Sequence, residues 1–182
     1  MKHPARWIAL TVAAIVVVFA VVLAVSIGND PQEDAQHSPF VGKPVPAFDL
    51  PTLTGTKVSN VSIAGKSVII NFWNTWCTPC RQELPALKKF YAEHASDTDF
   101  VMIGIVRDPQ ESNRAIRAYV EDHGMHWQIA LDPGAQAALD FATRGQPETL
   151  AVSPSGMVAA SQYGPMSVDQ MDQILAVARA TG

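Results

Sequence analysis

The chain has 182 residues, a length that predicts one domain with a short appendage. Its formal net charge is −4, and no cluster of Lys and Arg stands out, which argues against a nucleic acid partner because phosphate binding needs concentrated positive charge. Only two cysteines occur, so no second pair is available for a separate structural disulfide.

The first predicted element is a membrane-spanning helix over residues 7–27. This stretch, WIALTVAAIVVVFAVVLAVSI, is apolar, and no charged residue lies between Arg6 and Asp30. About 20 apolar residues suffice for a helix to cross the ~30 Å hydrocarbon core of a bilayer. Because Lys2 and Arg6 precede the stretch, the positive-inside rule predicts a cytoplasmic segment 1–6 and export of the remainder.

A cleaved signal peptide is the alternative to a permanent anchor. Ala24-Val25-Ser26 has the small residues of a cleavage site. The apolar run is longer than the roughly 7–15 residues typical of signal peptides, which favours the anchor. Both alternatives export the remaining chain to a compartment where disulfides persist, so the localisation expected for the domain is the same.

Residues 28–39 (GNDPQEDAQHSP) are polar and predict a flexible linker before a domain over 40–182. In this domain, short apolar runs alternate with amphipathic stretches, a pattern typical of an α/β domain with a mixed sheet. The predicted strands are 47–50, 57–59, 67–73, 99–106, 127–131, 149–152 and 157–162. The predicted helices are 78–94, 111–123, 134–141 and 168–179.

The candidate chemistry lies in Cys77-Thr78-Pro79-Cys80, which follows a predicted buried strand and opens a predicted helix. Unpaired N–H groups at a helix N-terminus stabilise a thiolate, the attacking form of cysteine. Cys77 is therefore the predicted nucleophile. Cys80, one turn later, is the predicted resolving cysteine that attacks the mixed disulfide. Pro79 suits a first helical turn, where an N–H has no partner.

Three other interpretations of the pair are less favoured. A structural disulfide closing so small a loop would stabilise the fold little. A zinc site needs more ligands than this pair, and the histidines show no matching spacing, so no metal is predicted. Two inert thiols would be unusual in an exported domain. A redox-active pair that needs no cofactor is the favoured interpretation.

The segment FWNTWCTPCRQELP resembles the active-site segment of thioredoxin-fold proteins, and more narrowly that of the anchored TlpA/ResA/CcmG-like (DsbE) thiol–disulfide oxidoreductases. The resemblance extends from Phe40 to the C-terminus. FVGKPVPAFDLPTL is similar to the N-terminal β extension of that group, Pro85 matches the kink proline of the active-site helix, and residues 108–127 resemble the group's inserted helix. The resemblance implies a thioredoxin-like fold with both additions, preceded by one transmembrane helix.

The resemblance also implies roles for further residues. Asn71 stands where thioredoxins carry a buried aspartate, and Glu83 matches the acid that this group places after the second cysteine, which implies proton transfer. A solvated glutamate is the alternative for Glu83. Gly145–Thr149 resembles the GxPET element, whose proline is cis and faces the cysteines, whereas Glu148 there is interpreted as structural. The predicted client-binding residues are Trp76, Thr78, Pro79, Gln146 and Pro147.

The function implied by the resemblance is reduction of disulfides in exported proteins, such as apocytochrome c during cytochrome c maturation, with a thiol-transporting membrane protein as electron donor. An oxidase or isomerase is the alternative, because the reduction potential sets the direction of exchange. A copper or haem chaperone is less favoured, since copper carriers of this fold use CxxxC. A peroxidase would need threonine at the position of Asn74.

Overall fold

The computed structural model of the chain describes residues 11–21 and 38–182. Residues 11–21 are helical, and their apolar side chains are exposed. Within the two described ranges, no helix combines the length and apolar character needed to cross a membrane. The predicted segment 1–6, the two ends of the predicted anchor 7–27 (residues 7–10 and 22–27), and the linker 28–39 apart from its last two positions lie outside the described residues, so these three assignments stay predictions.

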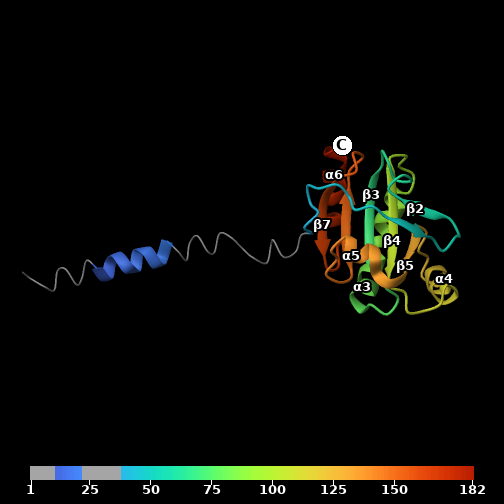
Figure 1. Ribbon diagram of the computed structural model, residues 1–182, viewed down its shortest axis with the longest axis horizontal. Helices are drawn as coiled ribbons and strands as arrows, with labels where there is room; N and C mark the ends of the chain where they lie inside the picture. Colours follow the sequence, from blue (N-terminus) through green and yellow to red (C-terminus); the bar gives the residue numbers. More distant parts are fainter. Residues whose placement is uncertain (1–10, 22–37) are drawn as a thin grey trace, which may run out of the picture. The chain divides into compact units, whose positions relative to one another are not determined.

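A five-stranded mixed sheet forms the centre of the C-terminal part (Figure 1), in the order β5-β4-β3-β6-β7. The strands β3, β4 and β5 are parallel, and the hairpin β6–β7 is antiparallel to β3. All residues of the central β3 are buried, as its apolar, β-branched sequence predicts. The five strands are β3 (Ser67–Trp73), β4 (Phe100–Arg107), β5 (Gln128–Asp132), β6 (Glu148–Val152) and β7 (Val158–Tyr163).

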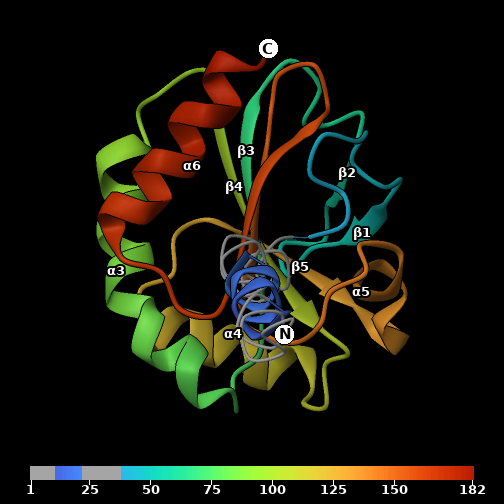
Figure 2. The same cartoon turned by 90° about the vertical axis from the view of Figure 1, so that its left-hand side faces the viewer.

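Different elements cover the two faces of the sheet (Figure 2). Long helices α3 and α6 lie on one face, and α5 with the small β1–β2 sheet lies on the other. Successive side chains of β3 alternate between the faces, so Asn71 points toward the side covered by α3. These elements are α3 (Thr78–His94), α4 (Asn113–Asp122), α5 (Gln136–Asp140), α6 (Val168–Ala180), β1 (Asp49–Pro51) and β2 (Lys57–Ser59), with a 3₁₀ turn, η1, at Pro133–Ala135.

The predicted α/β class with a mixed sheet is confirmed, and β3 and α3 have the predicted bounds. The helix predicted over 134–141 is wrong in its first turn: Gly134 and Ala135 have φ values of 76° and 57°, so a 3₁₀ turn precedes a shorter α5. Among the aromatic residues of α3, the side chain of Phe90 is fully buried, whereas that of Tyr91 is half-buried. The β1–β2 extension and the inserted α4 are both present.

Candidate active site

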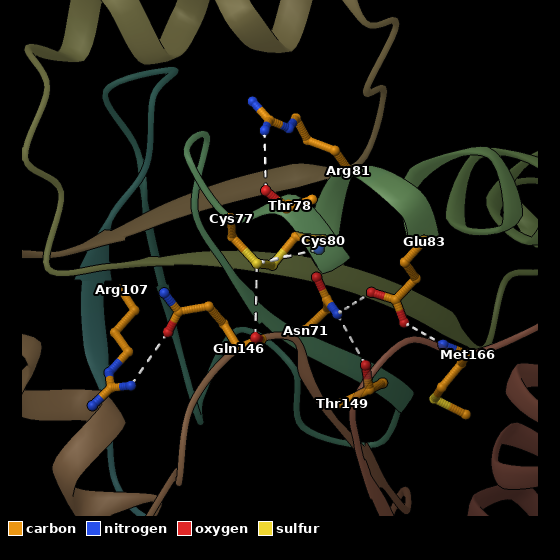
Figure 3. The surroundings of a disulfide bond; sticks show 10 residues. All are labelled: Asn71, Cys77, Thr78, Cys80, Arg81, Glu83, Arg107, Gln146, Thr149 and Met166. Carbon is orange, nitrogen blue, oxygen red and sulfur yellow. Dashed lines mark hydrogen bonds between the residues drawn. A yellow bond between two sulfur atoms is a disulfide. The ribbon is translucent and has the colours of Figure 1, made fainter.

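The two cysteines lie where the carboxyl end of β3 leads into α3 (Figure 3). Cys77 is the N-cap residue of α3, and Cys80 lies in its first turn; their sulfur atoms form a disulfide with an S–S distance of 1.99 Å. The Cys80 backbone N–H donates to Cys77 Sγ at 3.2 Å. In the reduced protein the same N–H group is placed to stabilise a Cys77 thiolate. The described structure is therefore the oxidised form of the pair.

Exposure differs sharply around the disulfide. Cys77 and Cys80 are only 3% and 6% exposed, whereas the neighbouring Trp76 is 54% exposed. Thr78 is also exposed, and its Oγ1 accepts a hydrogen bond from the Arg81 guanidinium at 3.2 Å. The rim beside the disulfide thus presents an aromatic surface and a small polar surface to solvent. In residues 11–21 and 38–182, no group of three or more His, Cys, Asp or Glu side chains is arranged to hold a metal ion.

The loop before β6 faces the cysteines from the opposite side (Figure 3). The Gln146–Pro147 peptide bond is cis, as the resemblance implies. The Gln146 carbonyl oxygen lies 3.7 Å from Cys77 Sγ. Glu148 is fully buried; its carboxylate accepts the Arg144 backbone N–H at 2.9 Å and pairs with the Arg144 guanidinium at 3.4 Å. These contacts brace the loop, which agrees with a structural role for Glu148.

Glu83 is buried behind the disulfide, with 2% of its surface exposed. The interpretation as a solvated glutamate is therefore wrong. One carboxylate oxygen accepts the Met166 backbone N–H at 2.9 Å, and the other accepts from Asn71 Nδ2 at 3.3 Å. Burial raises the pKa of Glu83 to about 7, because removal from water disfavours the charged form more than these two hydrogen bonds favour it. A carboxyl group with this pKa exchanges its proton near neutral pH.

Asn71 links Glu83 to β6 and lines a small cavity together with Cys80. Its Nδ2 also donates to Thr149 Oγ1 at 2.9 Å, which fixes the side chain between β6 and α3 (Figure 3). Asn71 and Cys80 line a cavity of about 10 Å³, which is close to the minimum needed for one water molecule. In the sequence, Asn71 stands out only as the residue at the position of the thioredoxin aspartate. The available signal was a side-chain amide in the middle of a fully buried strand whose other residues, apart from Ser67 at its start, are apolar.

A second hollow lies on the solvent side of the disulfide. This cleft, of about 250 Å³, is lined by Trp76 and Gln146, both predicted to bind the client, and by Arg107. Arg107 Nη1 donates to the Gln146 side-chain oxygen at 3.3 Å (Figure 3). Arg107 was missed in the sequence because it ends β4, far along the chain from the cysteine motif. The structure thus brings together all predicted site residues, while their individual roles stay predictions.

The comparisons agree with this geometry. The model of the AhpC/TSA family matches residues 41–161. The thioredoxin-like protein YneN of Bacillus subtilis is 33% identical over 74% of this chain and 78% of its own length. The thiol:disulfide interchange protein DsbE of Pseudomonas fluorescens is 30% identical over 87% of this chain and 85% of its own.

A solved structure shows the same fold. The crystal structure of a thiol:disulfide interchange protein of the thioredoxin family from Chlorobium tepidum is 29% identical; it superposes with a TM-score of 0.61 over 74% of this chain and 94% of that one. Together with a disulfide at a helix N-terminus, these likenesses define both fold and chemistry. The chain belongs to the AhpC/TSA family and is a thiol–disulfide oxidoreductase with a thioredoxin-like fold.

Proposed function

We propose that the protein is a membrane-anchored reductase of disulfides in exported proteins, acting outside the cytoplasm. The observation that carries this proposal is the Cys77–Cys80 disulfide at the start of α3, facing cis-Pro147 with a buried acid behind it. By resemblance, the expected client is apocytochrome c before haem attachment, and the expected electron donor is a thiol-transporting membrane protein.

The reaction begins from the dithiol form. The Cys77 thiolate attacks one sulfur of the client disulfide, and the other client sulfur leaves as a thiolate and takes up a proton. Cys80, deprotonated by the Glu83 carboxylate, then attacks Cys77 Sγ. This second attack forms the Cys77–Cys80 bond seen in the structure and releases the client's second thiolate. Two electrons pass to the client, and the membrane donor later returns two to the pair.

The geometry supports the assigned roles. The helix N-terminus favours negative charge on Cys77, which is the requirement for a nucleophile. Glu83 and Cys80 are three positions apart on α3, and Asn71 contacts Glu83 and lines a cavity with Cys80. Pro147 has no N–H to donate, and the Gln146 carbonyl before it would accept a hydrogen bond from an extended client strand. Trp76, Thr78 and Pro79 would form the opposite rim of that client site.

Export and anchoring rest on the sequence and on the relatives. The apolar run over residues 7–27 is long enough to cross a bilayer, and positive charge precedes it. Residues 11–21 of this run are helical with exposed apolar side chains, a surface suited to lipid. The Pseudomonas DsbE aligns with 87% of this chain. Fractionation of cells that express the full chain tests this: we expect recovery with membranes, and protease added outside should remove the catalytic domain.

The direction of exchange is tested by trapping. In the full chain with Cys80→Ala, Cys77 should hold its client as a mixed disulfide that can be purified and identified. Acid quenching and alkylation of wild-type cells should show Cys77 and Cys80 mainly as thiols. A fully oxidised pair in growing cells would contradict the reductase and indicate the oxidase alternative. The variant Cys77→Ala/Cys80→Ala is the control for non-covalent capture.

A further inference from the structure

We propose that the cleft between Trp76 and Gln146 is a specificity subsite in which Arg107 binds a carboxylate side chain of the client, close in sequence to the attacked cysteine. This inference rests on the proposed reductase function and adds the chemical class of the preferred client. The cleft holds about 250 Å³, enough for one acidic side chain but not for a folded element.

The position of the cleft ties it to the attacked bond. Gln146 contributes to both: its backbone oxygen lies 3.7 Å from Cys77 Sγ, and its side-chain oxygen accepts a hydrogen bond from Arg107 at 3.3 Å. Figure 3 shows the Gln146 side chain reaching from the cysteine side toward Arg107. A client strand that lies along the Gln146 backbone therefore brings a flanking side chain to the guanidinium.

Arg107 has N–H donors that remain available for a ligand. A guanidinium carries five N–H donors arranged as a fork that matches a carboxylate, and the contact found for Arg107 in the described part of the chain uses one of them. The side chain is half-buried, which limits the screening of its charge by solvent. A carboxylate in the cleft would thus accept a charge-assisted hydrogen bond from a partly shielded partner.

Asp108, the other charged residue that lines the cleft, forms hydrogen bonds within the rim of the cleft. Asp108 accepts the Gly134 backbone N–H at 3.2 Å through Oδ1 and the Gln110 amide at 3.1 Å through Oδ2. These bonds join the segment after β4 to the turn before α5. Asp108 still carries a negative charge, so the proposal requires that the open Arg107 donors outweigh it. A client lysine is the competing outcome, and the experiment includes it.

The backbone of the rim is unusual. In the described residues, three non-glycine residues have positive φ, and two of them, Asp108 at 44° and Ala135 at 57°, line this cleft. Such conformations cost free energy and persist where the surrounding structure holds them, often at binding sites. The rim is thus held in an unfavourable backbone conformation beside the one open guanidinium of the cleft.

The test uses the reduced full chain in detergent and a set of synthetic peptides, each with one internal disulfide. The peptides form sets of three. Within each set, one position carries Glu, Gln or Lys, and the sets differ in which position within three residues of a cysteine is varied. Each second-order rate constant is divided by the rate constant for reduction of the same peptide by dithiothreitol. This normalisation removes the effect of the added charge on the intrinsic reactivity of the peptide disulfide. At one position at least, we expect the Glu peptide to react about five- to tenfold faster than the Gln peptide.

The Glu-to-Gln rate ratio should fall to about one in Arg107→Gln, persist in part in Arg107→Lys, and decrease with added salt. Arg114→Gln, at an exposed position on α4, is the charge-matched control and should keep the wild-type ratio. Equal rates at every position, a ratio that survives Arg107→Gln, or a faster Lys peptide would overturn the subsite and leave the reductase intact. Failure to reduce any peptide would overturn both proposals.

Discussion

Glu83 is the residue whose ionisation we expect to control release of the client. Because burial raises the pKa of Glu83 to about 7, the side chain can accept the Cys80 proton above that pH but not well below it. In Glu83→Gln, the resolving step should slow by about 10²–10⁴-fold at alkaline pH and lose its rise around pH 7. Single-turnover release of a peptide dithiol, followed across pH, measures this step.

Glu93→Gln, at an exposed position on the same helix, is the control for that experiment. It keeps the helix and removes an acid of the same type at a site that does not face the disulfide. The Glu93 variant should show the wild-type profile. An unchanged profile in Glu83→Gln would show that another group or solvent accepts the Cys80 proton.

Burial of Glu83 also predicts a pH-dependent stability. The folded-state pKa of about 7 lies above the usual glutamate value of 4.5, so the folded protein holds this proton more tightly than the unfolded chain. The contribution is fully present below pH 4.5 and is lost as pH rises through 7. At about 1.4 kcal/mol per pH unit, the shift corresponds to about 3 kcal/mol.

The measurement is the free energy of unfolding of the oxidised wild-type and Glu83→Gln proteins in urea across pH. The value for the variant, relative to wild type, should increase by up to about 3 kcal/mol between pH 4 and pH 8. Taking the difference at each pH cancels any constant effect of the substitution on packing. A difference that stays flat with pH would mean that Glu83 does not titrate in this range.

The role of a single residue was predictable where its reaction partner lies close to it in the sequence. Cys77 and Cys80 form one short motif, so their pairing needed no tertiary information. The environment of Glu83 depends on the Met166 backbone N–H, 83 positions away, and that of Arg107 on Gln146, 39 positions away. The cis state of the bond before Pro147 came only from the family resemblance, since most X–Pro bonds are trans.

Gly104 shows how one position governs the packing of a whole strand. It lies in β4, and a Cβ atom added there would lie 2.9 Å from the indole nitrogens of both Trp73 and Trp127. Both indole nitrogens are buried, and neither has a hydrogen-bond partner among the described residues. The glycine therefore admits two large rings over the sheet, which explains a residue that is otherwise unfavourable in a strand.

Gly104→Ala should destabilise the oxidised domain by about 1–3 kcal/mol through overpacking, measured by urea denaturation. In a Trp127→Phe background, where a smaller ring replaces the indole, Gly104→Ala should lower the free energy of unfolding by less than it does in the wild-type background. A double-mutant cycle isolates this coupling from the cost of the smaller ring. Additive effects of the two substitutions would show that the alanine methyl group does not press on Trp127.

Bounds of elements were predictable where sequence pattern and local signals coincide. The apolar run of β3 ends at Trp73, four positions before the N-cap Cys77, and Ser167 caps α6, with Gln170 completing a capping box. The first turn of the helix predicted over 134–141 failed because Ala135 adopts a left-handed conformation that no propensity predicts for alanine. The backbone N–H of the preceding Gly134 donates to Asp108, so this turn includes a tertiary contact that local sequence does not reveal.

At the scale of the whole domain, a charged cluster joins α3, the segment before β4, and α6, at the opposite end of α3 from the cysteines. His94 contacts Asp97 and Asp172 through its two ring nitrogens, both at 2.9 Å. Arg179 pairs with Asp97 at 2.7 Å. Burial acts to lower the pKa of His94, but the hydrogen bonds to Asp172 and Asp97 outweigh it and raise the pKa above its usual value.

A raised pKa in the folded state means that His94 stabilises the domain fully below its unfolded pKa of about 6.5, and that this stability is lost as pH rises through the folded value. We therefore expect His94→Gln to lower the free energy of unfolding most at about pH 5.5 and progressively less at higher pH. High salt should shrink the effect because Asp172 is partly exposed. A gap between wild type and variant that widens toward alkaline pH would contradict this assignment.

His94 and Glu83 affect the pH dependence of stability in the same direction, because both have a higher pKa in the folded state than in the unfolded chain. The domain should therefore lose stability between about pH 4.5 and pH 8, a range that includes the pH at which Glu83 becomes able to accept the Cys80 proton. Because the two groups share no partner, their effects should add. The double variant Glu83→Gln/His94→Gln should have a nearly flat stability profile over this range, and a profile as steep as that of wild type would place the pH dependence in other groups.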